Sequence, residues 1–223
     1  MAERAAFFDV DGTLITTTSL FSFLRHWFAA LGRPAEDYRS FRARLAAMTA
    51  AGVPRAQTNR TYFQAYAGHD AAEVAEHGHR WFAGELAGGE LFHPGVLARL
   101  REHAADGMLT VLVSGSFPAC LEPIRRHLGT DVLICSEPTI HDGRYTGEIA
   151  EPMIGPAKAA AVRRLATARG LDLGGSYAYG DHSSDLPVLR SVGHRVQVGD
   201  DPELAAVSAA ERWELLPAAV TRA

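Results

Sequence analysis

Residues 7–14 of the chain read Phe7-Phe8-Asp9-Val10-Asp11-Gly12-Thr13-Leu14. The apolar residues that lead into Asp9 predict a buried strand over residues 5–10. Side chains two positions apart in an extended strand point the same way, so we expect the carboxylates of Asp9 and Asp11 to leave the strand end side by side. Gly12 then lets the backbone turn sharply. This stretch therefore predicts a strand that carries chemical groups at its carboxyl end.

The two carboxylates have one functional and one structural interpretation. Carboxylates this close repel each other, and the pKa of one rises unless a cation neutralises the pair. Mg²⁺ is the natural cation because it prefers hard oxygen ligands. The pair also suits a nucleophile at Asp9 that forms an acyl-phosphate, with Asp11 as the acid and base. The structural interpretation is an Asx-type turn after the strand. Residues elsewhere in the chain are needed to distinguish the two interpretations.

The remainder of the sequence divides into a helical block and an alternating block. Between residues 16 and 90 apolar residues recur at helical spacing and no strand pattern is found, which predicts an all-helical insertion. Helices are expected at about residues 20–28, 35–51, 55–67 and 71–86.

After Pro94 the pattern alternates between helices and short apolar strands. Strands are expected at residues 109–113, 132–136, 177–179, 195–198 and 213–216, and helices at 95–105, 117–128, 157–168, 186–191 and 202–210. Asp142-Gly143 predicts a tight hairpin turn within residues 140–145. This alternation predicts a doubly wound α/β fold, whose active site lies at the carboxyl ends of the strands.

Composition limits the classes of function. The chain has 223 residues, 47% of them hydrophobic, and a net charge of −4, which argues against binding nucleic acid by neutralising phosphates. Two cysteines, Cys120 and Cys135, make no disulfide framework and no zinc spacing, so we expect buried or half-buried thiols. No apolar run is long enough to span a membrane, and the short segment before the first strand leaves no room for a signal peptide. We therefore expect a cytoplasmic protein.

Three further segments of the chain carry groups that can bind an anion or a metal ion. The strand at 109–113 ends in Ser114-Gly115-Ser116, whose hydroxyl and backbone N–H groups make a phosphate cradle, although Ser-Gly turns are common. Asp181 directly follows the strand at 177–179, where a metal ligand is useful, and Asp185 is either a ligand or a helix N-cap. Lys158 begins a helix, where a cation opposes the helix dipole, so it is either a surface lysine or a partner of a nearby anion.

Together these elements resemble the haloacid dehalogenase-like superfamily of phosphohydrolases. FFDVDGTL resembles motif I, VLVSGS motif II, Lys158 motif III and YGDHSSDLPVL motif IV. The helical insertion resembles a C1-type cap, and the DGRYTG hairpin is similar to that of subfamily IB, the phosphoserine phosphatase-like branch. The resemblance covers the whole chain. It implies a Rossmann-like core of residues 1–15 and 91–223 and a helical cap domain of residues 16–90.

The resemblance also implies roles for individual residues. Asp9 is the nucleophile, and Asp11 protonates the leaving group and then activates water. The implied Mg²⁺ ligands are Asp9, the backbone carbonyl of Asp11, Asp181 and, in the outer shell, Asp185. The implied phosphate-binding residues are Gly12, Ser114, Gly115 and Lys158.

The implied function is hydrolysis of a small-molecule phosphomonoester through an aspartyl-phosphate. Two alternatives stay open: a phosphotransferase or phosphomutase that uses the same intermediate, and a non-catalytic binding module. The substrate also stays open, with histidinol phosphate, phosphoserine and other biosynthetic intermediates as candidates. Phosphoserine phosphatases carry serine where Gly12 stands, a glutamate at the position of Thr18, and asparagine at the position of Ser184.

The cap is expected to select the leaving group because it closes over the site. The candidate specificity residues are Thr17, Thr18, Phe21, Arg25, His26 and His182. His69, His77 and His79 fit no metal spacing and are expected at the surface. The oligomeric state does not follow from the sequence.

Overall fold

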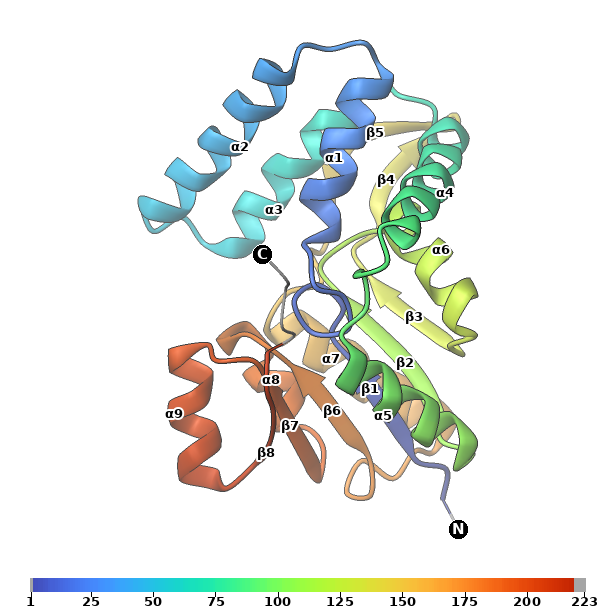
Figure 1. Cartoon of the computed structure of the whole chain (residues 1–223), viewed down its shortest axis with the longest axis vertical. Helices are drawn as coiled ribbons and strands as arrows, with labels where there is room; N and C mark the ends of the chain where they lie inside the picture. Colours follow the sequence, from blue (N-terminus) through green and yellow to red (C-terminus); the bar gives the residue numbers. More distant parts are fainter. Residues whose placement is uncertain (1, 219–223) are drawn as a thin grey trace.

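The computed structural model describes residues 2–218 and is built around a six-stranded sheet (Figure 1). The strand order is β3-β2-β1-β6-β7-β8, and all neighbouring strands are parallel. The strands are β1 (Ala5–Phe8), β2 (Leu109–Ser114), β3 (Val132–Cys135), β6 (Tyr177–Gly180), β7 (His194–Val198) and β8 (Glu214–Leu216). The chain builds outward from β1 in both directions, so the carboxyl end of β1 lies at the topological switch point of the sheet.

Helices cover both faces of this sheet. Along β1, Ala6 and Phe8 belong to one apolar cluster, whereas Ala5 and Phe7 belong to another. The first cluster includes residues of α5 (Pro94–Ala105) and α6 (Pro118–Leu128). The second includes residues of α7 (Pro156–Arg169), α8 (Leu186–Leu189) and α9 (Pro202–Glu211). Strands buried on both faces explain the continuous apolar runs, and the predicted doubly wound α/β fold is confirmed.

The segment between β1 and β2 is helical. It forms α1 (Ser19–Ala30), α2 (Ala35–Ala50), α3 (Arg55–Phe63), the short 3₁₀ helix η1 (Gln64–Tyr66) and α4 (Ala71–Ala87). Figure 1 shows these helices together above the sheet. The helix expected over residues 55–67 therefore ends early and tightens into a 3₁₀ turn. We call residues 16–90 the helical block.

The hairpin expected around Asp142-Gly143 is present. Strands β4 (Pro138–His141) and β5 (Arg144–Ile149) pair antiparallel, and the turn residues have φ of 48° and 76°, as a type I′ turn requires. The backbone N–H of Gly68 donates to the carbonyl of Tyr145 at 2.7 Å, so the hairpin is joined to the helical block. The domain boundaries placed at residues 15 and 91 stay a prediction.

The expectations for the thiols and for membrane spans can be compared with the described residues. Cys120 and Cys135 are both buried and unbonded to each other, as predicted. Burial raises the pKa of the Cys135 thiol to about 12, which keeps it protonated. Within residues 2–218 we find no helix with the length and apolar character that crossing a bilayer requires.

Candidate active site

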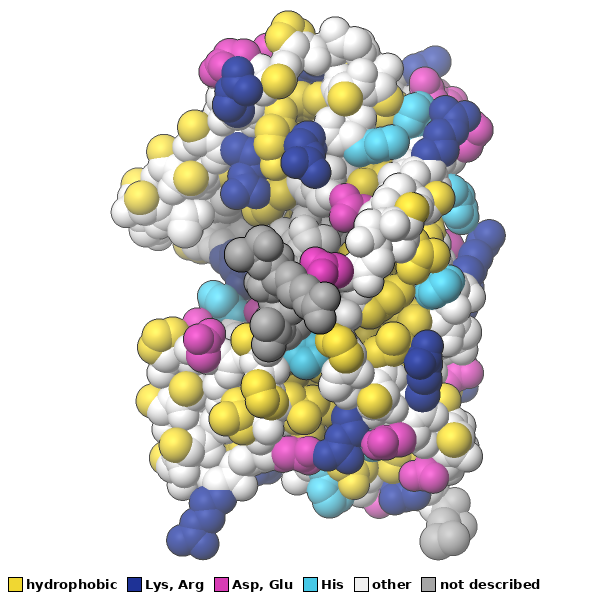
Figure 2. All heavy atoms as spheres, viewed as in Figure 1, with side chains coloured by type: hydrophobic (Ala, Val, Ile, Leu, Met, Phe, Trp, Pro, Cys, Tyr) yellow, Lys and Arg dark blue, Asp and Glu magenta, His cyan; other side chains and the backbone are white. Residues whose placement is uncertain are grey.

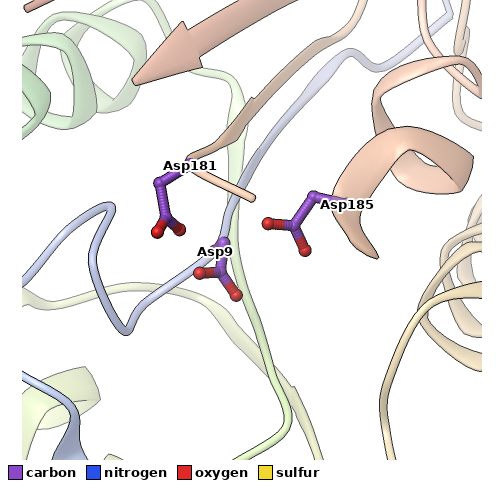
Figure 3. A group of neighbouring side chains, drawn as sticks. All are labelled: Asp9, Asp181 and Asp185. Carbon is purple, nitrogen blue, oxygen red and sulfur yellow. The ribbon is translucent and has the colours of Figure 1, made fainter. Parts of the chain in front are cut away.

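Three carboxylates converge at the carboxyl edge of the sheet. Asp9 follows β1, Asp181 follows β6, and Asp185 ends the short 3₁₀ helix η2 (Ser183–Asp185). Figure 3 shows the three side chains pointing toward one another, and each offers an oxygen within 4.8 Å of the others. Adjacent parallel strands end at the same edge, which is why residues 172 positions apart in the sequence (9 and 181) meet here. Asp185 occupies the N-cap position of α8, but its side chain makes no capping hydrogen bond there and belongs to the carboxylate cluster instead.

Lys158 lies between two of these carboxylates. Its Nζ donates to Oδ1 of Asp185 at 2.8 Å and also to Oδ1 of Asp9, and the residue is only 5% exposed. Burial by itself lowers the pKa of Lys158, but the carboxylates of Asp185 and Asp9 outweigh burial and raise it. The surface-lysine interpretation is therefore wrong. Lys158 is also the only lysine among the 22 basic residues of the chain.

The cluster carries more negative charge than Lys158 neutralises. Burial raises the pKa of Asp9 well above its ordinary value, and repulsion from Asp185 and Asp181 adds to this against the lowering effect of Lys158. Burial likewise raises the pKa of Asp181, although Thr13 donates a 2.8 Å hydrogen bond to its Oδ1. Three carboxylates around one lysine make an all-oxygen donor set with excess negative charge. This set fits a hard divalent cation such as Mg²⁺.

Gly12 brings its backbone directly against the carboxylate of Asp181. A Cβ at residue 12 would collide with Oδ2 of Asp181, and the φ of Gly12 is +86°, a conformation that other residues rarely adopt. The turn after β1 therefore requires glycine for two reasons: its backbone conformation and the room that it leaves for Asp181.

Asp11 is arranged differently from our expectation. Strand β1 ends at Phe8, and Val10 lies in a turn, so Asp9 and Asp11 do not project together from an extended strand. The carboxylate of Asp11 instead accepts a 2.8 Å hydrogen bond at Oδ1 from the backbone N–H of Ser19. Burial raises the pKa of Asp11, and the hydrogen bonds from Ser19 partly oppose that effect. A carboxyl group apart from the cluster and with a raised pKa is suited to proton transfer.

The Ser114-Gly115-Ser116 turn lies beside the carboxylates and is held from two sides. The hydroxyl of Ser136 donates to the carbonyl of Gly115 at 2.9 Å, and Nδ2 of Asn59 donates to the same oxygen at 3.2 Å. Ser114 is buried, and its hydroxyl accepts from the N–H of Ser116 at 3.0 Å. The helical block thus contacts the expected phosphate cradle through Asn59.

One cavity of about 560 Å³ joins these groups. The sequence-predicted residues that line it are Asp9, Asp11, Gly12, Thr18, Phe21, Ser114, Gly115, Lys158, Asp181, His182 and Asp185. Figure 2 shows the surface notched between the end of α2 and the part of the molecule that contains α9. The cavity is of the size that holds a small-molecule ligand.

Arg25 and His26 do not reach this cavity, contrary to expectation. They line a separate hollow next to Arg80 and Glu85, because α1 runs away from the strand ends and these residues lie two turns beyond Thr18. Thr17 is not among the lining residues either.

The expectation for the three cap histidines is correct only for the exposed His79. His69 and His77 are half-buried against the ring of Trp27, with ring centroids 5.1 and 5.2 Å away.

Sequence reasoning missed the contribution of α3. Asn59, Tyr62 and Arg55 line the cavity, and Nη1 of Arg55 lies 3.1 Å from Nδ1 of His182 and 3.0 Å from Oγ of Ser184. Arg55 therefore connects the helical block with the loop that carries Asp181 and Asp185. No local pattern marks these residues, because their role depends on how α3 is placed over the sheet.

Comparison with known proteins identifies the family of this chain. Residues 6–190 match the haloacid dehalogenase-like hydrolase family, and the chain belongs to that family. A probable phosphatase of Mycobacterium tuberculosis is 33% identical over 222 residues, an alignment that covers 96% of this chain and 75% of that protein. A phosphoserine phosphatase of the same organism is 30% identical over 221 residues, with 95% and 70% covered.

A solved structure shares the fold over nearly the whole length. It belongs to a Bordetella pertussis protein of unknown function, with a TM-score of 0.85 and 28% identity, and the match covers 97% of this chain and 99% of that one. The doubly wound core and the helical segment between β1 and β2 are therefore an arrangement that this chain shares with a protein of known structure.

Proposed function

We propose that the protein is a phosphatase that hydrolyses a small-molecule phosphomonoester, with Asp9 as the nucleophile. The observation that carries the proposal is the position of Lys158 between Asp9 and Asp185, next to Asp181 and the Ser114 turn in one cavity. The family is one of hydrolases, and two relatives are named as phosphatases.

The first step is attack of an Asp9 carboxylate oxygen on phosphorus, opposite the ester oxygen. The O–P bond to Asp9 forms while the P–O bond to the leaving group breaks, which gives an aspartyl-phosphate. Phosphoryl transfer depends mostly on positioning and charge neutralisation. Lys158 supplies a fixed positive charge beside Asp9, and Ser114 with the N–H groups near Gly12 and Gly115 supplies donors to the phosphoryl oxygens.

Asp11 moves the protons. It gives its proton to the leaving alkoxide in the first step and takes a proton from water in the second, when the water oxygen attacks phosphorus and Asp9 is released. The raised pKa of Asp11 favours the protonated form that the first step needs. The second step returns Asp11 to its starting state.

The donor set described above would hold Mg²⁺ with the carboxylates of Asp9 and Asp181, with Asp185 and the backbone carbonyl of Asp11 nearby. A bound Mg²⁺ supplies positive charge between an anionic nucleophile and an anionic substrate.

The test is phosphate release from a panel of esters with Mg²⁺ and with EDTA. The panel holds p-nitrophenyl phosphate, phosphoserine and histidinol phosphate. We expect release that needs Mg²⁺ from at least one ester. Conversion or transfer without net phosphate release would support a mutase or phosphotransferase. If no ester is hydrolysed, converted or transferred, the binding module is supported.

A second readout is independent of activity. Mg²⁺ should raise the thermal midpoint of the wild-type protein, because a ligand that binds only the folded state stabilises it, by about 2.7 kcal/mol at 100 times its Kd. The Asp181→Asn variant should show a much smaller increase. Equal increases in both proteins would contradict the assigned donor set.

A further inference from the structure

The cavity has two ends of different chemistry. All carboxylates that line it, those of Asp9, Asp11, Asp181 and Asp185, belong to the segments that follow β1 and β6. The opposite end is built by α1, α2, α3 and the turn between α2 and α3. Its apolar lining residues are Leu20, Phe21, Leu45 and Val53.

The charges at this apolar end are positive. Arg55 is the one charged residue of the helical block that lines the cavity among the residues that the structure describes, and its guanidinium extends to His182 and Ser184 on the loop after β6. A second guanidinium, that of Arg42, lies over the ring of Phe21, with Cζ 3.7 Å from the ring centroid. An ammonium group here would lose water without gaining a carboxylate partner, and the charged group that lies over Phe21, that of Arg42, is a cation.

The apolar surface is held in place by its neighbours. The ring of Phe21 packs edge-on against Tyr62 with centroids 6.1 Å apart, and the hydroxyl of Tyr62 donates to the carbonyl of Leu20 at 2.6 Å. Leu45 is 2% exposed. A fixed apolar wall favours an apolar leaving group, by about three- to fourfold in affinity for each methylene that it buries.

We infer that the substrate is the phosphomonoester of an apolar alcohol that carries no ammonium group. The inference rests on the proposed phosphatase function and narrows it. It separates this chain from any relative that acts on a phosphorylated amino acid, because the leaving group of such an ester brings an ammonium group to an apolar end that offers it no carboxylate. The other polar residues of α3 that line the cavity, Thr58 and Asn59, are neutral and bring no charge to it.

Matched esters test the inference. The pair n-hexyl phosphate and 6-aminohexyl phosphate differs only in the terminal ammonium group, and ethyl phosphate serves as the short reference. We expect kcat/KM for the hexyl ester to be at least tenfold higher than kcat/KM for the aminohexyl ester. We also expect it to be at least tenfold higher than kcat/KM for the ethyl ester. A smaller ratio in either comparison would overturn the inference.

A charge variant tests the cause of the preference. Thr49 is an exposed lining residue on α2, and its hydroxyl only bonds to the carbonyl of Leu45. Thr49→Glu places a carboxylate at the apolar end, and Thr49→Gln is its neutral match. The hexyl to aminohexyl ratio should fall at least fivefold in Thr49→Glu relative to Thr49→Gln. An unchanged ratio would contradict the assignment of charge at this end.

p-Nitrophenyl phosphate separates the two possible failures. If it is hydrolysed but the alkyl preference is absent, only the inference fails. If neither this ester nor any alkyl ester releases phosphate with Mg²⁺, the proposed function fails.

Discussion

The backbone N–H of Ser19 donates a 2.8 Å hydrogen bond to Oδ1 of Asp11. Ser19 is the first residue of α1, so the start of the helical block holds the carboxyl group that we propose as acid and base. The helix N-terminus favours the ionised form of Asp11, while burial favours the protonated form. The orientation of this group therefore depends on the position of α1.

Ser19→Pro should remove that hydrogen bond with little damage to the helix. Proline lacks the N–H and is favoured at the first helical position. It also requires an extended backbone in the residue before it, which Thr18 already has. Loss of one hydrogen bond to a charged group costs about 1.5–3 kcal/mol, so we expect kcat to fall roughly tenfold to a hundredfold.

Ser19→Ala is the control for this change. It keeps the N–H but loses the hydroxyl, which contacts Ser116 at 2.8 Å and also helps to lower the pKa of Asp11. Its kcat should stay within about threefold of wild type, since the bond to Asp11 is kept. Equal losses in the two variants would show that the hydroxyl, not the N–H, is responsible.

Lys158 gives a direct spectroscopic prediction because the chain has no other lysine. ¹³Cε-labelled lysine should give one signal in the metal-free protein. The signal should remain that of the ammonium form as pH rises past 10.5, because the carboxylates of Asp185 and Asp9 raise the pKa of Lys158 above that value. Titration at or below pH 10.5 would contradict the buried ion pair.

Gly12→Ala should harm the site more than the fold. The change strains a φ of +86° and forces Asp181 to move. Gly32→Ala is a matched control, because Gly32 has a φ of +68° and nothing within 4 Å of the added Cβ. Both variants should lose about 1–2 kcal/mol of stability from backbone strain.

Activity separates the two glycines. Gly12→Ala alone should lose at least about a hundredfold in kcat, because a displacement of about 1 Å at a positioned group has that effect. Denaturant unfolding and phosphate release measure the two quantities. Similar activity in the two variants would mean that the contact with Asp181 is unimportant.

Glu122 predicts a dependence of stability on pH. Its carboxylate accepts hydrogen bonds from Arg125 at 2.7 and 2.8 Å and from Arg126 at 3.0 Å, and these lower its pKa from 4.5 to about 2. Because the pKa is lower in the folded state, the stabilisation is complete above pH 4.5 and is lost as pH falls toward 2.

Glu122→Gln should therefore lower the free energy of unfolding by on the order of 1 kcal/mol at pH 7, since the group is partly exposed. Urea unfolding at several pH values should show the difference from wild type narrowing below pH 4.5. A difference that stays constant down to pH 3 would rule out this ion pair as its source.

Much of the core followed from the sequence because local patterns determine it. Apolar runs marked the strands, and Asp142-Gly143 marked a turn that only a few residue pairs can form. Residues that follow strands, such as Asp181, were found because parallel strands end at one edge of the sheet. The contact of Lys158 with two carboxylates is non-local, and the sequence suggested only that an anion lies near this lysine.

The helical block shows where sequence reasoning stops. Periodicity found its helices but not their direction relative to the sheet, so Arg25 and His26 were assigned to the cavity and Arg55 was missed. The end of β1 is a second case, because the hydrogen bond from Ser19 to Asp11 joins a turn to a helix that local patterns treat separately.

The most direct test of the account is phosphate release by wild type and by Asp9→Asn, with Mg²⁺ and at equal folded concentration. The substitution removes the nucleophile but keeps the size of the side chain, so the thermal midpoint should change little. We predict that kcat falls at least about a thousandfold, because loss of a covalent nucleophile costs that much or more. Activity within tenfold of wild type in the folded variant would contradict the central claim that Asp9 forms the bond to phosphorus.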